Sequence, residues 1–291
     1  MIPLFKGCAA ALITPFLPDG TLDEEALRAL IMMQNDAAMD ALVLLGTTGE
    51  PCTLTMQERE KVISIGLELA NMPVIVGTGA NDTKKAIEFA HQAKALGAHG
   101  QLCVTPYYNK TTQAGLLRHY TSILNACELP MIVYSVPSRT GMLIDPKTVK
   151  QLYDHPGIVG IKESGTDQSA IADLFALCPD LPVYSGNDDA ILPIMAQGGS
   201  GVISVVANIA PLMTRAVTSS CLQGNYQEAR EHQRSLLPLI RMLFSQVSPI
   251  PVKAALNMRH LIEDVLRPPL YPLEQPYRQQ LRELLSRTSY A

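Results

Sequence analysis

Short apolar runs recur along the chain, separated by longer stretches whose apolar residues have helical spacing. The eight runs are "CAAALIT" (8–14), "ALVLLG" (41–46), "PVIVGTG" (73–79), "GQLCVTP" (100–106), "PMIVYSVP" (130–137), "GIVGIKES" (157–164), "PVYSG" (182–186) and "SGVISVVAN" (200–208). Between them lie segments such as 23–36, which opens with acidic residues, and 83–97, which closes with Gly97. Eight strand–helix alternations predict parallel strands joined by crossover helices.

Two α/β architectures fit this alternation, an open doubly wound sheet and a closed (β/α)8 barrel of the TIM type. The open sheet predicts a glycine-rich dinucleotide loop after the first strand, but "LITPFLPDGT" has no G-x-G-x-x-G. "GTGAND" (77–82) has only two of the three glycines, which is typical of an ordinary strand–helix turn. Eight units within the first 224 residues therefore favour the closed barrel.

The strand pattern ends near residue 225, and three amphipathic segments follow it. They are "NYQEAREHQRSLLPLIRMLFSQ" (225–246), "PVKAALNMRHLI" (251–262) and "PYRQQLRELLSRT" (276–288). Four prolines between residues 268 and 276 predict a non-helical connection before the last helix. We expect a barrel with the active site over residues 1–224 and a C-terminal helical domain over 225–291.

Composition narrows the class of protein. With 47% hydrophobic and 17% charged residues, the chain can fill a large core, so disorder is excluded. A net charge of −4 with scattered Lys and Arg argues against a nucleic-acid partner, and the apolar runs are too short to span a bilayer. The six cysteines form no CxxC pair and the six histidines have no metal-ligand spacing, so we expect reduced thiols, no metal site and a cytoplasmic location.

The sixth run carries a lysine, Lys162, in an otherwise apolar strand. If Lys162 points into the barrel, the period of two sends Gly160 and Ile158 the same way and Glu163 outward. Desolvation disfavours the ammonium form, which leaves a neutral amine that can attack a ketone and form a Schiff base. The alternative is a lysine that reaches the barrel mouth or pairs with a carboxylate.

Chemistry in such barrels is carried by the carboxyl ends of the strands. The polar groups expected there are Thr47, Thr48, Tyr107, Tyr108, Tyr134 and Lys162. Hydroxyl groups suit the proton shuttle that Schiff-base chemistry needs. Each also has a structural explanation, because tyrosines can cap strand ends and threonines can cap turns.

Five motifs in order along the chain resemble the dihydrodipicolinate synthase family, and the similarity includes the helical tail. The motifs are "GTTGE" (46–50), "TPYYN" (105–109), "YSVPSRTG" (134–141), "GIKES" (160–164) and "GVISV" (201–205). The wider superfamily shares the lysine and the tyrosine and includes N-acetylneuraminate lyase and 2-keto-3-deoxy sugar-acid aldolases. The paired threonines, the paired tyrosines and Arg139 are similar to the synthase branch.

The resemblance implies an enzyme that condenses pyruvate with L-aspartate 4-semialdehyde in diaminopimelate and lysine biosynthesis. It implies that Lys162 forms the iminium with pyruvate and that Tyr134 donates and accepts protons. Thr47 would link Tyr134 to Tyr108, which crosses from a neighbouring subunit of a homotetramer, a dimer of dimers.

Three further residues would bind the substrates. Thr48 and Ile203 would hold pyruvate, and Arg139 would receive the carboxylate of the semialdehyde. No cofactor is expected, because the iminium on Lys162 is itself the electron sink.

The sequence departs from the family at its inhibitory lysine site. Many bacterial members carry a small polar pair after "GTTGE", then a histidine, and an acidic residue after "GTGAN". Here those positions are Pro51, Cys52, Met56 and Lys85. Because a cation at position 85 repels the amine of free lysine, we expect weak or absent feedback inhibition.

Two other functions remain open at this point. One is a sibling lyase that cleaves N-acetylneuraminate or a 2-keto-3-deoxy sugar acid through the same iminium. The other is a non-catalytic barrel that binds an oxo acid.

Overall fold

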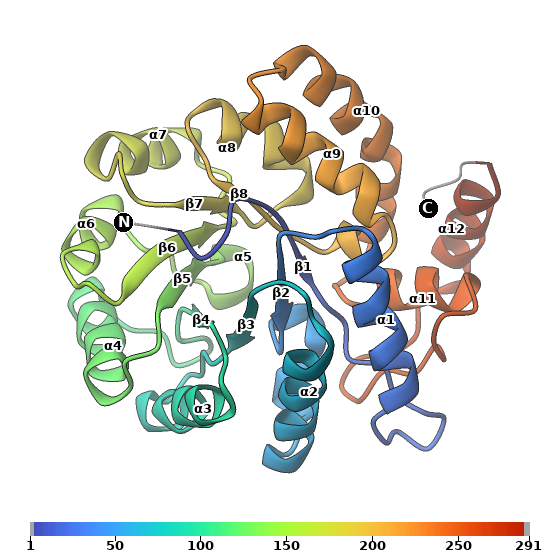
Figure 1. Cartoon of the computed structure of the whole chain (residues 1–291), viewed down its shortest axis with the longest axis horizontal. Helices are drawn as coiled ribbons and strands as arrows, with labels where there is room; N and C mark the ends of the chain where they lie inside the picture. Colours follow the sequence, from blue (N-terminus) through green and yellow to red (C-terminus); the bar gives the residue numbers. More distant parts are fainter. Residues whose placement is uncertain (1–2, 288–291) are drawn as a thin grey trace.

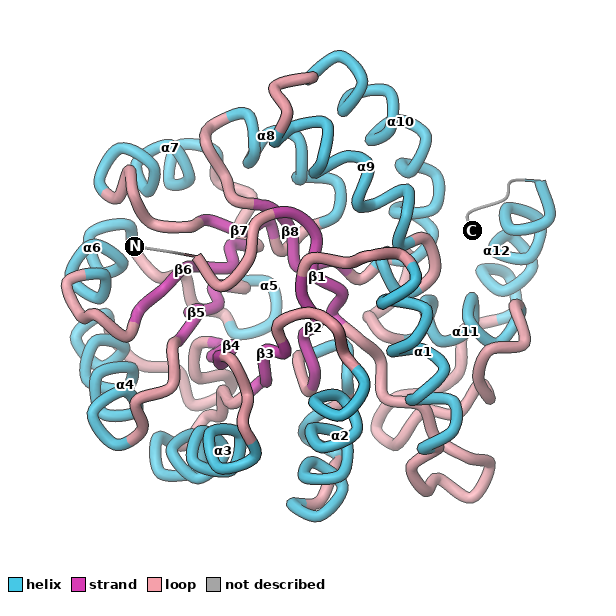
Figure 2. The backbone as a smooth tube through the Cα atoms, viewed as in Figure 1, coloured by secondary structure: helices cyan, strands magenta, loops and turns pink. Residues whose placement is uncertain are grey.

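The computed structural model describes residues 3–287 and contains a ring of parallel strands surrounded by helices (Figures 1 and 2). The strands are β1 (Gly7–Ala11), β2 (Ala41–Leu44), β3 (Val74–Gly77), β4 (Gly100–Val104), β5 (Met131–Ser135), β6 (Ile158–Glu163), β7 (Val183–Ser185) and β8 (Gly201–Ser204). Each strand pairs with its neighbour in sequence, and β1 pairs with β8 to close the barrel. The expected (β/α)8 architecture is confirmed.

Both faces of the strands are buried, which explains why the sequence shows continuous apolar runs and not alternation. Side chains such as Val43, Ile75, Ile132 and Tyr184 fill the interior of the barrel. A larger apolar cluster lies between the strands and the surrounding helices. The chain therefore has a packed barrel, and the open space lies only where the strands end.

Helices follow the strands in alternation. The helices of the barrel are α1 (Glu24–Asp36), α2 (Met56–Leu69), α3 (Thr83–Leu96), α4 (Gln113–Ala126), α5 (Pro137–Thr140), α6 (Pro146–Tyr153), α7 (Gln168–Leu177), α8 (Ile191–Ala196) and α9 (Pro211–Leu222). The acidic start predicted at residue 23 is the N-cap Asp23, and Gly97 ends α3 with φ of 98°. Short 3-10 turns, η1 (Thr47–Gly49), η2 (Pro51–Thr53), η3 (Asp188–Ala190) and η4 (Val206–Asn208), follow three of the strands.

One expectation about β6 is wrong. Ile158 lies in the outer apolar cluster, whereas its neighbour Val159 lies in the barrel interior. The cause is a shift in the β5–β6 register between Met131 and Ile132, which breaks the period of two. Beyond the shift the period resumes, and Lys162 pairs with Tyr134.

The three helices expected after residue 225 are α10 (Tyr226–Leu243), α11 (Ile250–Met258) and α12 (Gln275–Arg287). We call residues 225–287 the appendage; α10 packs against α9, and α10, α11 and α12 pack against one another (Figure 1). The non-helical connection expected among the prolines lies between α11 and α12. The end of the predicted last helix, residue 288, and the end of the predicted domain, residues 288–291, lie outside the described residues.

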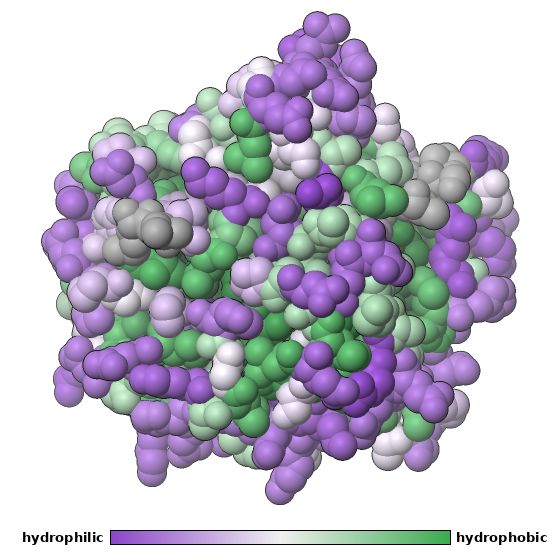
Figure 3. All heavy atoms as spheres, in the orientation of Figure 1, coloured by the Kyte–Doolittle hydropathy of each residue, from purple (hydrophilic) through white to green (hydrophobic). Residues whose placement is uncertain are grey.

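The surface carries charged side chains on the outer helices, with apolar side chains nearer the middle of the face seen in Figure 3. Cys52 is exposed, and the other five cysteines are buried with free thiols. Within residues 3–287 no helix is both long and apolar enough to cross a membrane.

Candidate active site

Lys162 is the penultimate residue of β6 and is 5% exposed. Its Nζ lies 4.4 Å from the centroid of the Tyr134 ring on β5, and Tyr184 on β7 flanks it on the other side. In the part of the chain that the structure describes, the side-chain Nζ of Lys162 makes no hydrogen bond and forms no ion pair within 4.0 Å. The alternative of a lysine paired with a carboxylate is therefore not what the structure shows.

Two adjoining cavities open at the carboxyl end of the barrel. One has a volume of about 260 Å³ and is lined by Lys162, Thr48 and Ser164. The other has a volume of about 310 Å³ and is lined by Cys52 and Tyr107. Both are lined by Gly46, Thr47, Leu102, Tyr134, Val136, Arg139 and Ser248. The expected residues Lys162, Tyr134, Thr47, Thr48 and Arg139 are thus gathered around one space.

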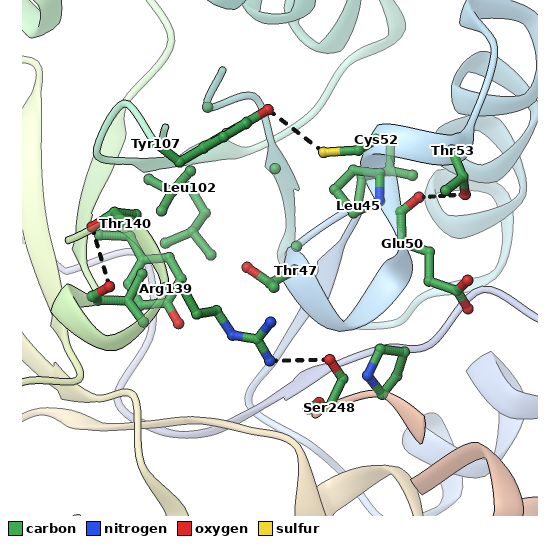
Figure 4. Close-up of a pocket in the computed structure, with 18 of the residues that line it drawn as sticks. Leu45, Thr47, Glu50, Cys52, Thr53, Leu102, Tyr107, Arg139, Thr140 and Ser248 are labelled. Carbon is green, nitrogen blue, oxygen red and sulfur yellow. Dashed lines mark hydrogen bonds between the residues drawn. The ribbon is translucent and has the colours of Figure 1, made fainter. Parts of the chain in front are cut away.

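Thr47 and Thr48 lie in η1, directly after β2. The side chain of Thr47 points toward Leu102 and Arg139, whereas the carboxylate of Glu50 points to the opposite side of the loop (Figure 4). Two non-glycine residues of this segment, Leu45 and Glu50, have left-handed φ angles of 56° and 53°. Such conformations cost free energy and persist only where surrounding contacts enforce them.

Arg139 lies on α5, at the mouth of both cavities. Its Nη2 donates a hydrogen bond to the carbonyl oxygen of Ser248 at 3.0 Å, and its side chain extends toward Ser248 in Figure 4. This bond holds the planar guanidinium across the entrance. A cationic fork at that position suits a substrate carboxylate.

Two of the expected residues are not brought to the cavities within one chain. Tyr108 is 91% exposed, has φ of 69° and lines neither cavity. Ile203, on β8, is fully buried among the side chains of the barrel interior. Because the side chain of Ile203 is buried, a ligand could contact this residue only through its backbone atoms.

Ser164 was not singled out from the sequence, whereas Tyr107 was expected at the strand ends. Ser164 lines the Lys162 cavity, and its buried Oγ has no hydrogen-bond partner among the described residues. Tyr107 Oη lies 3.5 Å from Cys52 Sγ, as Figure 4 shows. The signal for Ser164 was its position two residues after Lys162, which places it on the same face of the strand.

Asp188 was also missed, although an acidic residue directly after a strand end is itself a signal. Its buried carboxylate accepts hydrogen bonds from Ser204 Oγ and from the backbone N–H groups of Val205 and Val206, at 3.0 and 3.3 Å for the two amides. Burial raises the pKa of Asp188 to about 6, and these hydrogen bonds and the nearby Lys162 oppose the rise. Asp188 therefore fixes the end of β8 beside the cavity.

The chemistry of the site follows from these groups. A buried amine without an anionic partner can condense with a carbonyl carbon. The hydroxyls of Tyr134 and Thr47 can move protons beside it, and Arg139 can bind a carboxylate. The described residues contain no group of three or more His, Cys, Asp or Glu placed to hold a metal ion.

Comparison with known proteins identifies similar chains. Residues 4–288 match the dihydrodipicolinate synthetase family. A 4-hydroxy-tetrahydrodipicolinate synthase from Caldicellulosiruptor saccharolyticus is 44% identical over 286 residues, which cover 98% of this chain and 97% of the relative.

Solved structures agree with the sequence match. A dihydrodipicolinate synthase from Thermotoga maritima has a TM-score of 0.96 at 42% identity, covering 99% of this chain and 100% of that one. A chloride-inhibited dihydrodipicolinate synthase from Acinetobacter baumannii, solved in complex with pyruvate, has a TM-score of 0.94 at 42% identity, covering 97% of this chain and 98% of that one.

Proposed function

Because this chain belongs to the dihydrodipicolinate synthetase family, we propose a mechanism in which Lys162 carries its activity as a Schiff base. That activity is the one of a 4-hydroxy-tetrahydrodipicolinate synthase, a carbon–carbon lyase of lysine biosynthesis that condenses pyruvate with L-aspartate 4-semialdehyde. Relatives of this activity match nearly the full chain, which supports it over the sibling lyase and over a non-catalytic barrel.

One observation carries the proposal for Lys162. Its amine is buried at a cavity, over the ring of Tyr134 and without a carboxylate partner among the described residues. A carboxylate partner would hold the amine as an ammonium ion, which is not a nucleophile. The Nζ of Lys162 faces the cavity, where it can reach the ketone of pyruvate.

The proposed reaction begins at the amine of Lys162. The Nζ of Lys162 attacks the ketone carbon, water leaves, and an iminium forms. Tyr134, with Thr47 as its hydroxyl neighbour, removes a proton from the methyl group to give an enamine. The enamine carbon attacks the aldehyde of the second substrate, and the aldehyde oxygen takes up the proton from Tyr134 to become a hydroxyl. The amino group of that substrate then displaces Lys162 and closes the ring, so the enzyme returns to its starting state without a cofactor.

Substrate binding is assigned to groups around the same space. Thr48, which lines the Lys162 cavity, and the backbone at Ile203 hold pyruvate. Arg139 at the mouth binds the carboxylate of the semialdehyde. The guanidinium of Arg139, on a chain of net charge −4, gives the site a local preference for acids.

Tyr108 completes the relay only if another subunit supplies it. Its 91% exposure and left-handed φ leave the ring extended from the surface, away from the cavities of its own chain. We infer that the partner's ring enters beside Thr47 and that the protein is a homotetramer built from dimers. The wide apolar cavity beside Cys52 and Tyr107 offers room for such a ring.

Two further expectations remain predictions. One is that the chain divides into a barrel of residues 1–224 and a helical domain of residues 225–291. A cytoplasmic location is the other, which the free thiols support because they suit a reducing compartment.

The mechanism is tested by trapping the iminium. Incubation with pyruvate and borohydride should reduce it to a stable secondary amine, and peptide mapping by mass spectrometry should place that adduct on Lys162. Lys162→Ala should give no adduct and no turnover. Lys150→Ala, which removes an exposed lysine of α6, should leave both unchanged.

The trapping experiment also separates the alternatives. An adduct on another residue, or turnover by Lys162→Ala close to that of the wild type, would exclude the proposed role of Lys162. Faster turnover of N-acetylneuraminate or 2-keto-3-deoxygluconate than of the semialdehyde would identify a sibling lyase.

A further inference from the structure

We propose that Glu50 and Lys253 form a positioning pair through which the appendage holds Thr47 in the active site. The inference deepens the proposed function and rests on it, since Thr47 matters only if its hydroxyl serves the proton relay. Neither member of the pair lines the Lys162 cavity, although Glu50 lines the adjoining cavity beside Cys52; we infer that both act through the loop that carries Thr47. They are positioning residues and not catalytic ones.

The pair joins segments that are far apart in the sequence. Lys253 on α11 places its Nζ 2.6 Å from Oε1 of Glu50, and both side chains are fully buried. The same Nζ donates to the carbonyl oxygen of Val265 at 2.8 Å and lies 4.3 Å from the centroid of the Phe16 ring. The contacts with Glu50 and Phe16 join the appendage to the barrel, whereas the bond to Val265 lies within the appendage.

The second oxygen of Glu50 is held as well. Its Oε2 accepts a hydrogen bond from the backbone N–H of Arg267 at 3.1 Å. The side chain of Arg267 donates to the carbonyl oxygens of Thr53 and Gly20, each at 2.7 Å, and pairs with Glu58. The appendage thus makes hydrogen bonds to the loop of residues 47–53 at two points, Glu50 and Thr53, which lie on either side of Cys52.

A backbone hydrogen bond links Glu50 to Thr47. The N–H of Glu50 donates to the carbonyl oxygen of Thr47 at 3.3 Å, so a single 3-10 turn separates the held carboxylate from the active-site hydroxyl. Glu50 has a left-handed φ of 53°, a conformation that needs external support in a non-glycine residue. Figure 4 shows the two side chains on opposite sides of the loop, and Glu50 lines only the cavity beside Cys52, whereas Thr47 lines both cavities.

A stability role alone does not account for this arrangement. A buried ion pair is weak evidence for stability, because apolar residues of similar volume are often at least as favourable. A buried pair can instead specify one geometry among several, and this geometry places a hydroxyl that the reaction uses. A displacement of about 1 Å at a reacting group can lower a rate by about 100-fold.

The test separates positioning from stability by counting folded sites. Glu50→Gln, Lys253→Met and the double variant Glu50→Gln/Lys253→Met are titrated with pyruvate and borohydride, which counts sites with a competent Lys162. Two rates per titrated site are then measured: deuterium incorporation into the pyruvate methyl group in D2O, which reports proton abstraction, and kcat. Urea unfolding gives the stability of each variant.

We expect each single variant to lose stability and to lose about 10- to 100-fold in both rates per titrated site, with KM for pyruvate changing much less. The double variant removes the unpaired buried charge, so its stability should recover toward that of the wild type. Its methyl exchange should stay at least about 10-fold low, because the bond from Lys253 is lost and only the backbone N–H of Arg267 still holds the side chain at position 50. A double variant that recovers its stability but not its rate of methyl exchange would show that the pair positions Thr47.

Arg278→Met is the matched control. It breaks the Arg278–Asp264 pair, a partly buried pair inside the appendage that does not contact residues 46–53. This variant should lose stability without losing either rate per titrated site. Wild-type rates per titrated site in the single variants, or exchange that recovers together with stability in the double variant, would overturn the inference. A wild-type protein that forms no adduct would instead refute the proposed function.

Discussion

Lys162 and Tyr134 are direct partners in the register of β6 and β5, and the Lys162 amine lies 4.4 Å from the centroid of the Tyr134 ring. The relationship places a phenol beside the carbon at which an iminium would form. Tyr184, the partner of Lys162 on the other side, directs its hydroxyl away, donating to the carbonyl oxygen of Phe5 at 2.8 Å. The two tyrosines flank the same lysine but differ in whether their hydroxyl is free to act.

Tyr134→Phe should therefore lower kcat by about 100- to 10,000-fold, the range for loss of a general acid–base group. The ring remains over Lys162, so stability should change little. The measurement is steady-state kinetics together with the rate of borohydride trapping.

Tyr184→Phe is the control for this prediction. It removes a buried, hydrogen-bonded hydroxyl and should cost about 1 kcal/mol of stability while leaving kcat near the wild-type value. Equal losses of kcat in the two variants would show that packing around Lys162, and not the Tyr134 hydroxyl, sets the rate.

Tyr108 offers a test of the subunit arrangement. Tyr108→Phe and Lys162→Ala should each be nearly inactive as homo-oligomers. Mixing the two, with dissociation and reassembly, should restore activity, because a hybrid contains a site with an intact Lys162 and a tyrosine supplied by the other chain. Size-exclusion chromatography with light scattering gives the oligomeric state of each mixture. Absence of any recovery in confirmed hybrids would place Tyr108 outside the relay.

Free L-lysine should inhibit weakly or not at all. Lys85 forms an exposed ion pair with Glu88 at 3.2 Å, and its Nζ lies 5.0 Å from the Phe89 ring. Arg59 stacks on the same ring, 3.8 Å from its centroid, so a second cation lies near Lys85 and adds to the repulsion of an amine. Initial rates at millimolar L-lysine and saturating pyruvate provide the measurement. Strong inhibition there would contradict the reading of Pro51, Cys52, Met56 and Lys85.

The dependence of stability on pH should carry a contribution from Glu163. Burial raises the pKa of Glu163 to about 7, despite the hydrogen bond from the backbone N–H of Gly165 that favours the carboxylate. The folded state then binds the proton more tightly than the unfolded state, whose ordinary pKa lies near 4.5. Stability should consequently fall as pH rises from about 4.5 to about 7, by at most roughly 3 kcal/mol from this group.

Glu163→Gln removes this titration. Urea unfolding of wild type and variant across that pH interval should show the wild type losing stability relative to the variant as pH rises. The opposite slope would show that folding stabilises the carboxylate, and parallel curves would show that folding leaves the pKa of Glu163 unchanged. Asp173→Asn, an exposed acid on α7, serves as the control and should run parallel to the wild type.

The sequence by itself determined the architecture and most of the site. Continuous apolar strands can be buried on both faces only in a parallel sheet covered by helices, and eight such units in register leave a closed barrel. Because reactive groups of a barrel lie at its strand ends, Lys162, Tyr134, Thr47 and Thr48 could be placed together from their positions in the runs.

The tertiary structure decided what depends on contacts between distant segments. The outward Ile158 follows from a register shift between two strands, and the pairing of Glu50 with Lys253 joins residues 203 positions apart. The carbonyl oxygen of Ser248, which accepts the hydrogen bond from Arg139, likewise comes from a turn of the appendage. Local periodicity encodes which face of an element is buried, but not which remote side chain it meets, because that choice is made by packing of the whole chain.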